Sequence, residues 1–265
     1  MINNLRVKCN LCGSSDCKLI KVFTKKPLKE TDFKLKNYHR EVYFCNNCEV
    51  YFNHHKFDME KIYSGKYNKD TYDNKILENY NKIMNYPFEI SCNKHRVERI
   101  VKFINKPSKV LDIGSGLCVF LGELKKHGFD CYFLDPDEDS YKHSIKNVRV
   151  KGFKSSLHDL KTDIKFDIIT LNNVIEHRKN PLRMLEDAKR FLKDDGIIYI
   201  EVPFAKIFTK LTNQPGFDIA HYYIFTEKSM KLLLDKANLK VIKSGITEIA
   251  DLYVFYAFLK KIEPE

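Results

Sequence analysis

Apolar residues in the second half of the chain follow two periods, one typical of buried strands and one typical of helices. Runs rich in β-branched and aromatic residues predict seven strands. The first strand begins at Val110, and the other six span 130–134, 148–152, 166–171, 196–200, 239–243 and 251–259. Because helical segments separate several of these runs, the pattern predicts an α/β fold with five parallel strands. A late hairpin-like pair then completes a seven-stranded sheet.

The predicted helices carry apolar stripes and recognisable ends. Directly after the first strand, four apolar residues recur at positions i, i+3, i+4 and i+7 and predict one face against the sheet: Leu117, Phe120, Leu121 and Leu124. Asn180 and Pro181 predict the N-cap and first residue of another helix, which the acidic turn at 194–196 is expected to close. Thr226 is expected to cap a last helix. Helical spacing over 95–104, ended by a proline, predicts one more helix before the first strand.

The segment after the first strand combines an acidic residue with two closely spaced glycines. Gly114 and Gly116 allow a tight turn and let a ligand approach the backbone where a Cβ atom would collide. Cys118 stands two residues after Gly116, so the segment reads Gly-x-Gly-x-Cys. Because this is not the G-x-G-x-x-G pattern of dinucleotide-binding domains, NAD or FAD binding is disfavoured. The strand, turn and helix therefore predict the first unit of a different nucleotide-cofactor domain.

Composition narrows the class of protein. With 265 residues, 43% of them hydrophobic, and no apolar run long enough to cross a bilayer, we expect a soluble protein without membrane insertion. No signal peptide is visible, and eight cysteines then favour a reducing compartment, so the expected location is cytoplasmic. The net charge of +11 comes from lysines spread along the whole chain, which suits an anionic small molecule and makes nucleic acid a weaker candidate partner.

Four cysteines near the start of the chain form two Cys-x-x-Cys pairs, Cys9 with Cys12 and Cys45 with Cys48. Each pair presents two thiolates from one knuckle turn, and zinc takes four sulfur ligands in structural sites. Residues 1–56 are therefore predicted to form a small zinc-ribbon-like module. Redox chemistry is the alternative, and it is disfavoured because neither pair precedes a helix of an α/β unit.

The order of hydrophobic strand, Asp, x, Gly, x, Gly resembles motif I of class I S-adenosylmethionine (SAM) dependent methyltransferases. Glu176 and His177, which follow the fourth strand, resemble the corresponding segment of the small-molecule members. The resemblance implies a Rossmann-like methyltransferase domain over 105–265, preceded by a helical linker or lid over 57–104. Cys118 departs from the family, in which a third glycine is common.

By the same resemblance, cofactor contacts fall at the carboxyl ends of successive strands. Asp112 would order the glycine loop and meet the methionine amino group, with a loop-bracing role as the alternative. Asp135 would accept hydrogen bonds from the ribose hydroxyls, unless it caps the following helix. The remaining candidates belong to the glycine turn, the adenine end and the methionine end: Gly114, Gly116, Ser156, Leu157, Asn172 and Asn173.

Two histidines are candidates for a catalytic base. His221 is the first choice, because the stretch from His221 to Thr226 resembles a "His, aromatic, Phe-Thr" segment of sugar methyltransferases in which a histidine is the base; His177 is the second. The alternatives are a histidine packed among aromatic residues and a surface histidine. The candidate acceptor contacts are Glu176, Tyr222, Tyr223 and Glu201. For the tyrosines the alternative is a core position, and for the two acids it is loop bracing or solvation at a strand end.

The combination of an amino-terminal double Cys-x-x-Cys module with this domain resembles deoxysugar and surface-polysaccharide methyltransferases. It implies SAM-dependent O-methylation of a nucleotide-linked sugar or another capsule precursor, by a monomer or homodimer with structural zinc. N- or C-methylation of a related sugar comes next. Two further hypotheses stay open, an RNA methyltransferase whose basic surface grips phosphates and a non-catalytic zinc-binding interaction protein.

Overall fold

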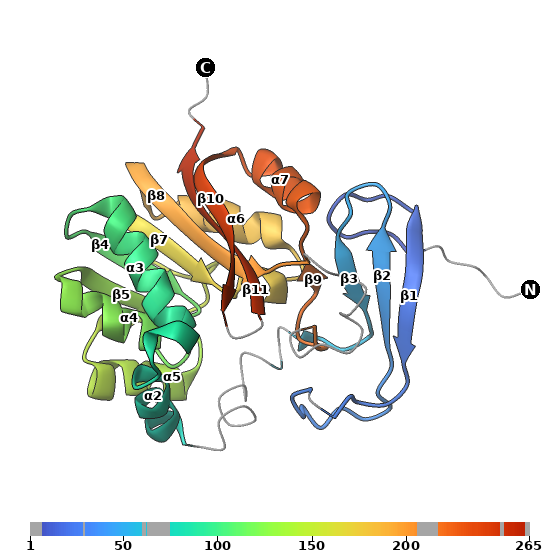
Figure 1. Cartoon of the computed structure of the whole chain (residues 1–265), viewed down its shortest axis with the longest axis horizontal. Coiled ribbons are helices and arrows are strands. Elements are labelled where there is room, and N and C mark those ends of the chain that lie inside the picture. Colours follow the sequence, from blue (N-terminus) through green and yellow to red (C-terminus); the bar gives the residue numbers. More distant parts are fainter. Residues whose placement is uncertain are drawn as a thin grey trace, which may run out of the picture.

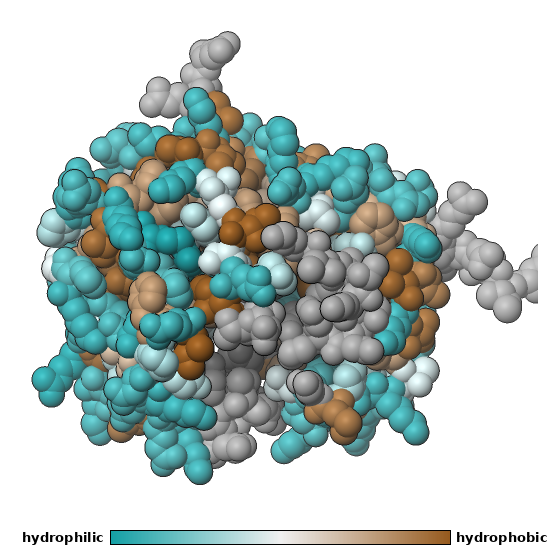
Figure 2. Space-filling model, viewed as in Figure 1, coloured by the Kyte–Doolittle hydropathy of each residue, from teal (hydrophilic) through white to brown (hydrophobic). Residues whose placement is uncertain are grey.

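The computed structural model describes residues 7–28, 30–59, 62, 75–205, 217–249 and 252–262. They form a small β-sheet that contains much of the start of the chain, and a large sheet flanked by helices (Figure 1). The segment 63–67, which the sequence assigns to the linker, lies outside the described residues. No helix of the described part is long and apolar enough to cross a membrane. Hydrophilic residues cover much of the described surface on the face seen in Figure 2.

The large sheet has the seven strands that the sequence predicts. In spatial order they are β10 (Leu239–Ile249), β11 (Leu252–Lys261), β8 (Leu192–Pro203), β7 (Phe166–Asn172), β4 (Lys109–Ile113), β5 (Asp130–Leu134) and β6 (Lys151–Phe153). The central five, from β8 to β6, are parallel. The late pair forms an antiparallel hairpin whose strand β11 pairs with β8. The predicted α/β fold class is therefore confirmed.

Helices cover both faces of the large sheet (Figure 1). They are α2 (Ile76–Met84), α3 (Cys92–Ile104), α4 (Val119–Leu124), α5 (Glu138–His143), α6 (Pro181–Lys189) and α7 (Glu227–Lys236). Successive strand residues point to opposite faces. Val110 of β4 accordingly joins the core cluster that includes α3 and α4 residues, whereas its neighbour Leu111 joins the cluster that includes α6 and α7 residues. The central strands are thus buried on both faces, as parallel strands usually are.

Several helix ends follow the sequence signals. Asn180 caps α6 by accepting a hydrogen bond from the backbone N–H of Arg183, and Pro181 is the first helical residue. Thr226 begins α7 with a capping box. The helix predicted over 95–104 starts earlier, at Cys92, because the Ser91 side chain caps it.

The end of helix α6 differs from the prediction. The helix ends at Lys189 and does not reach the acidic turn at 194–196. Leu192, whose spacing also fits the helical stripe, already belongs to β8 and pairs with Phe166 of β7. A buried leucine satisfies a helix and a central strand equally well, so its spacing alone did not decide between them.

The third strand is also shifted from its predicted range of 148–152. Residues 144–148 continue α5 as a π-helical turn, and Arg149 then changes the chain direction with a φ of 59°. The strand β6 starts only at Lys151. The apolar residues that suggested a strand, Val148 and Val150, are buried by this turn instead.

The small sheet combines the start of the chain with a distant segment. Its strands, all antiparallel, are in spatial order β1 (Cys17–Phe23), β2 (Arg40–Cys45), β3 (Tyr51–His54) and β9 (Tyr223–Ile224). Strand β9 directly precedes the helix α7 of the large layer. The sheet that carries the cysteine pairs is therefore joined to the other layer by main-chain hydrogen bonds.

Candidate functional site

A cavity opens where the chain reverses its direction across the large sheet. From β4 the chain runs through β5 to β6 on one side and then crosses to β7 and β8 on the other. Open α/β sheets bind ligands at the carboxyl ends of the strands beside such a switch. The cavity there has a volume of about 530 Å³, and its lining includes the glycine turn, Asn172, Asp218 and His221. A second cavity of about 530 Å³ adjoins it at Gly114 and Val174.

The glycine turn has the left-handed backbone that its sequence suggests. Gly114 has a φ of 70° and Gly116 a φ of 53°. A Cβ atom on Gly114 would lie 2.9 Å from the side chain of Val174, whereas one on Gly116 would meet no atom within 4 Å. Since Gly116 lines the first cavity, the missing side chain leaves room for a ligand there. Cys118 has a φ of 58° and precedes α4 as its N-cap, so a third glycine would be less strained than this cysteine.

Asp135 joins the end of β5 to the glycine turn. Its carboxylate accepts a hydrogen bond from the backbone N–H of Gly116 and one from that of Asp137, both at 2.9 Å. Burial raises the pKa of Asp135 to about 6. The alternative that Asp135 caps the next helix does not hold, because Asp137 is the residue that caps α5. Asp135 also lines the first cavity, with its carboxylate held by the loop that a nucleotide would contact.

Asp112 lies at the end of β4 and links it to β7. Its Oδ1 atom accepts hydrogen bonds from the Thr170 hydroxyl at 2.6 Å and from the Asn172 amide at 2.9 Å. Burial raises the pKa of Asp112 to about 6. The Oδ1 atom of Asn172 is buried and has no hydrogen-bond partner among the described residues. Asp112, Asn172 and Asn173 all line the first cavity, so a bracing role and a ligand-binding role are both compatible with this geometry.

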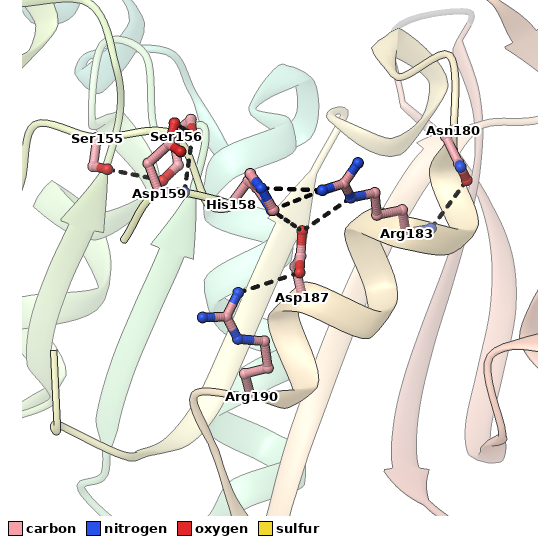
Figure 3. A network of polar contacts seen from close by, with 8 residues as sticks. All are labelled: Ser155, Ser156, His158, Asp159, Asn180, Arg183, Asp187 and Arg190. Atoms are coloured by element: carbon pink, nitrogen blue, oxygen red, sulfur yellow. Dashed lines mark hydrogen bonds and ion pairs between the residues drawn. The ribbon is translucent and has the colours of Figure 1, made fainter. Parts of the chain in front are cut away.

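The second cavity lies where the sequence places the adenine end. Ser156 and Leu157, both cofactor candidates, line it. Figure 3 shows how the loop that carries them is held: Ser156 bonds to Asp159, while His158 faces Arg183 and Asp187 of α6. The Ser156 hydroxyl donates to Asp159 at 2.6 Å, so this side chain is already engaged within its own loop.

Two histidines and a glutamate meet in the wall of the first cavity. The rings of His177 and His221 lie 4.4 Å apart between centroids, at an interplanar angle of 61°. A ring nitrogen of each histidine and a carboxylate oxygen of Glu176 lie within 4.8 Å of one another. The surface-histidine alternative for His177 is excluded, because this ring is packed beneath the loop at Ala220. Both histidines and Glu176 line the cavity.

The protonation of this group follows from its surroundings. The Nδ1 atom of His177 lies 3.1 Å from the carbonyl oxygen of Ala220, which can only accept, so Nδ1 carries the proton and Nε2 is left as an acceptor. Burial, and then the neighbouring His221, lower the pKa of His177 well below its usual value. Glu176 is fully buried, and neither carboxylate oxygen has a hydrogen-bond partner among the described residues. Burial raises its pKa to about 8.

The other acceptor candidates lie elsewhere. Tyr223 is fully buried and donates its hydroxyl to the carbonyl of Lys179, and Tyr222 packs against His55 at 5.6 Å between ring centroids. Neither tyrosine is among the residues that line the two cavities. The structure thus places both in the core, which is the alternative that the sequence left open.

The Cys-x-x-Cys pairs come together as the sequence predicts. Their four sulfur atoms lie within 4.8 Å of one another, and the four thiols are free. Both turns have the same form: the N–H of Gly13 bonds to the carbonyl of Cys9, and that of Glu49 bonds to the carbonyl of Cys45, each at 2.8 Å. Gly13 and Glu49 both have a positive φ. Two equivalent knuckles therefore present four sulfurs to one point, a donor set suited to tetrahedral zinc.

Comparison with protein families agrees with this geometry. A family model described as a methyltransferase domain matches residues 86–244, which is more than half of the chain. The chain belongs to this methyltransferase family. The match includes the strands β4 to β8 and both histidines, and it begins after the two Cys-x-x-Cys pairs.

Curated relatives and solved structures resemble the methyltransferase domain at low identity. Ubiquinone biosynthesis O-methyltransferases of Rickettsia bellii and Haemophilus ducreyi are each 27% identical, over 150 and 103 residues, or 54% and 35% of this chain. These matches span 58% and 44% of the two relatives, about half of their length. The fold is shared with the 1,6-didemethyltoxoflavin-N1-methyltransferase of Burkholderia thailandensis at a TM-score of 0.58 and 15% identity, covering 84% of this chain and 96% of that one. The magnesium protoporphyrin IX methyltransferase of Synechocystis PCC 6803 gives 0.57 at 14%, covering 73% and 98%.

Sequence reasoning missed one cationic side chain of the methyltransferase site. Arg96 of α3 lines the first cavity, close to Asp112. Its guanidinium is held by the fully buried Glu201, at 2.6 Å, and Glu201 also binds Arg99 and the Tyr199 hydroxyl. Glu201 is therefore neither solvated nor among the cavity-lining residues, contrary to both sequence interpretations. Arg96 lies off the apolar stripe of its helix and its partner is 105 residues away, so no local pattern marks it.

Proposed function

We propose that this chain is a SAM-dependent methyltransferase that transfers a methyl group to a hydroxyl oxygen of a small molecule. The observation that carries the proposal is the shape of the site. One cavity joins the glycine turn, with Asp112 and Asp135, to the cluster of Glu176, His177 and His221. A nucleotide cofactor bound at the first group would present its reactive end to the second group.

The residues present fit SAM. The missing side chain of Gly116 leaves open space beside the Asp135 carboxylate, which would accept hydrogen bonds from the ribose hydroxyls. The orphaned Oδ1 atom of Asn172 would accept from the methionine ammonium group, with Asp112 beside it. SAM would supply a methyl group that its sulfonium already activates.

His221 would act as the general base. A hydroxyl acceptor gains from a base that removes its proton while the oxygen bonds to the methyl carbon and the carbon–sulfur bond breaks towards sulfur. Neutral imidazole serves this purpose near pH 7, and the close contact between His177 and His221 disfavours a double positive charge. The other products are S-adenosylhomocysteine and a proton that leaves through the histidine. Glu176, buried without a partner among the described residues, would form a hydrogen bond with the methyl acceptor.

For the acceptor we propose a nucleotide-activated sugar or a related surface-polysaccharide precursor. The resemblance of the double Cys-x-x-Cys module and of the His221 segment to sugar methyltransferases supports this class. The names of the curated relatives, ubiquinone biosynthesis O-methyltransferases, support transfer to oxygen and offer a phenolic ring as the competing acceptor. The cysteine knuckles would hold structural zinc, since the four sulfurs already converge.

The test is an incubation of the protein with SAM and two acceptor panels, nucleotide-linked sugars and dihydroxyphenols. Mass spectrometry would follow S-adenosylhomocysteine and the methylated product. We expect turnover of a sugar, and His221→Ala should lower kcat by about 10²- to 10⁴-fold while SAM binding persists. Turnover of phenols alone would reject the sugar class, and full activity of His221→Ala would reject this histidine as the base.

A further inference from the structure

The loop that carries His221 has its main-chain carbonyls satisfied in an unusual way. Buried carbonyl groups need hydrogen-bond donors, so each carbonyl of this loop is expected to have a partner. Within residues 217–222, the carbonyls of Phe217, Asp218, Ile219, His221 and Tyr222 all bond to groups from residues 40–55. These residues lie in and beside strands β2 and β3. The described residues up to 56, which also contain the four cysteines, are hereafter called the cysteine module.

The methyltransferase domain supplies only part of this support. The His177 ring donates a hydrogen bond to the carbonyl of Ala220, and the backbone N–H of Tyr222 donates to the carbonyl of Glu176. Each of the other five carbonyls of residues 217–222 accepts a hydrogen bond from the cysteine module. The position of His221 over the cavity is therefore set largely by a part of the chain outside the matched family region.

Asn53 is at the centre of these contacts. Its Nδ2 group donates to the carbonyl of Asp218 at 2.8 Å and to the carbonyl of His221 at 2.7 Å, and its backbone N–H donates to Tyr222 at 3.0 Å. The side chain is almost fully buried, at 4% exposure. Both partners are carbonyls, so only one orientation of the amide fits, and a carboxylate in its place would repel both. One amide group thus clamps the two ends of the turn that holds His221.

Two further side chains of the module hold the same loop. Arg40 donates to the carbonyl of Phe217 at 2.7 Å, and its charge is balanced by the equally buried Glu30 at 3.0 Å. His55 approaches the carbonyl of Ile219 at 3.1 Å. Thr31, next to Glu30, lines the first cavity together with Asp218 and His221. The module therefore forms part of the wall at the histidine end of the cavity as well as the support of the loop.

We propose that Asn53 is a positioning residue for methyl transfer, through which the cysteine module fixes His221 against the acceptor. The inference rests on the proposed function in taking His221 as the base. Asn53 touches neither the cavity nor the reacting atoms and acts through the backbone of its partner. Because a misplacement of about 1 Å can cost on the order of 10²-fold in rate, we expect the loss of these two hydrogen bonds to lower turnover.

The test compares Asn53→Asp and Asn53→Ala with wild type. Asn53→Asp keeps the shape and repels both carbonyls, and Asn53→Ala removes the donor without adding charge. We expect kcat for the acceptor to fall by about 10- to 100-fold in both variants, the acidic limb of the kcat–pH profile to move, and the Kd for SAM to stay within about twofold. Hydrogen exchange of peptide 217–226 should be faster. The matched control is Lys228→Gln, which breaks the exposed ion pair with Glu49 between the same two parts and should change none of these readouts.

The outcomes separate the two proposals. Unchanged turnover and unchanged exchange in both Asn53 variants would overturn the positioning role. Parallel loss of SAM binding and acceptor turnover would overturn it as well, because Asn53 would then support the whole fold. If no acceptor is methylated by wild type, the proposed function fails, and the exchange of peptide 217–226 alone still decides whether Asn53 holds the loop.

Discussion

Replacement of Asp135 by asparagine should weaken SAM binding by a predictable amount. Two of the acceptor positions of Asp135 are taken by the N–H groups of Gly116 and Asp137, both at 2.9 Å, and the rest are available to ribose hydroxyls. Asparagine has a single acceptor oxygen, so it cannot satisfy both N–H groups and the ribose. At least one hydrogen bond to a charged group is lost, worth roughly 1.5–3 kcal/mol. At about 1.4 kcal/mol per factor of ten, the Kd for SAM should rise roughly 10- to 150-fold.

The same residue predicts a pH dependence. Burial raises the pKa of Asp135 from 3.8 to about 6, and in the proposed site the ionised form would accept the hydrogen bonds of two ribose hydroxyls. SAM affinity should therefore be full well above pH 6 and fall by up to about tenfold per pH unit well below it. Burial raises the pKa of Asp112 to about 6 as well. The contribution of Asp135 is consequently read from the Kd of Asp135→Asn divided by the Kd of wild type, a ratio that should shrink as the pH falls.

Isothermal titration calorimetry with SAM between pH 5 and 8 measures both effects without an acceptor. Asp130→Asn is the matched control, because it makes the same change at the opposite end of β5, where the carboxylate forms an exposed ion pair with Lys151. Its Kd should stay within about twofold of wild type, since a surface pair contributes little. Equal Kd values for wild type and Asp135→Asn, or a ratio independent of pH, would refute the assignment of Asp135 to the ribose.

Two further predictions concern stability. Burial raises the pKa of Glu176 from 4.5 to about 8, so between these pH values the folded protein retains a proton that the unfolded chain releases. The unfolding free energy of wild type should therefore fall relative to that of Glu176→Gln as the pH rises from 4.5 to 8, by up to about 1.4 kcal/mol per pH unit. Urea titrations at a series of pH values measure this difference. Parallel pH profiles would contradict it. Treatment with a zinc chelator, or Cys48→Ser, should lower Tm by about 5 °C or more. Either change should also speed hydrogen exchange of peptide 217–226. A protein isolated without zinc would disprove the metal site.

The cofactor half of the site could be predicted because its signals are local. The glycine turn, Asp112 and the acid at the end of β5 follow from short motifs, and the parallel sheet brings them to one edge. What the sequence could not show is how Cys118 fits there. It adopts the left-handed conformation that glycine would take, with a φ of 58°, before the helix begins. A motif gives the spacing of such residues and leaves their backbone strain unstated.

The acceptor half depends on pairings that no local pattern reveals. Tyr222 and Tyr223 looked like acceptor contacts, yet β9 pairs with β3, more than 160 residues earlier in the chain, and this pairing holds both side chains in the core. The register of a strand decides which face a residue takes, and a two-residue strand carries too short an alternation to fix it. Arg96 escaped notice for the same reason, since its role follows from the distant Glu201.

Strand β9 also explains why the small sheet and the methyltransferase layer depend on each other. Without β9, strand β3 would be an open edge with unpaired N–H and carbonyl groups, which proteins avoid exposing. Without β3 and its neighbours, five carbonyls of the His221 loop would each lose a hydrogen-bond donor. Each part therefore satisfies main-chain groups of the other, at the place where His221 lines the cavity. Zinc would then act on catalysis at a distance, by keeping the strand that carries Asn53 in the register that holds His221.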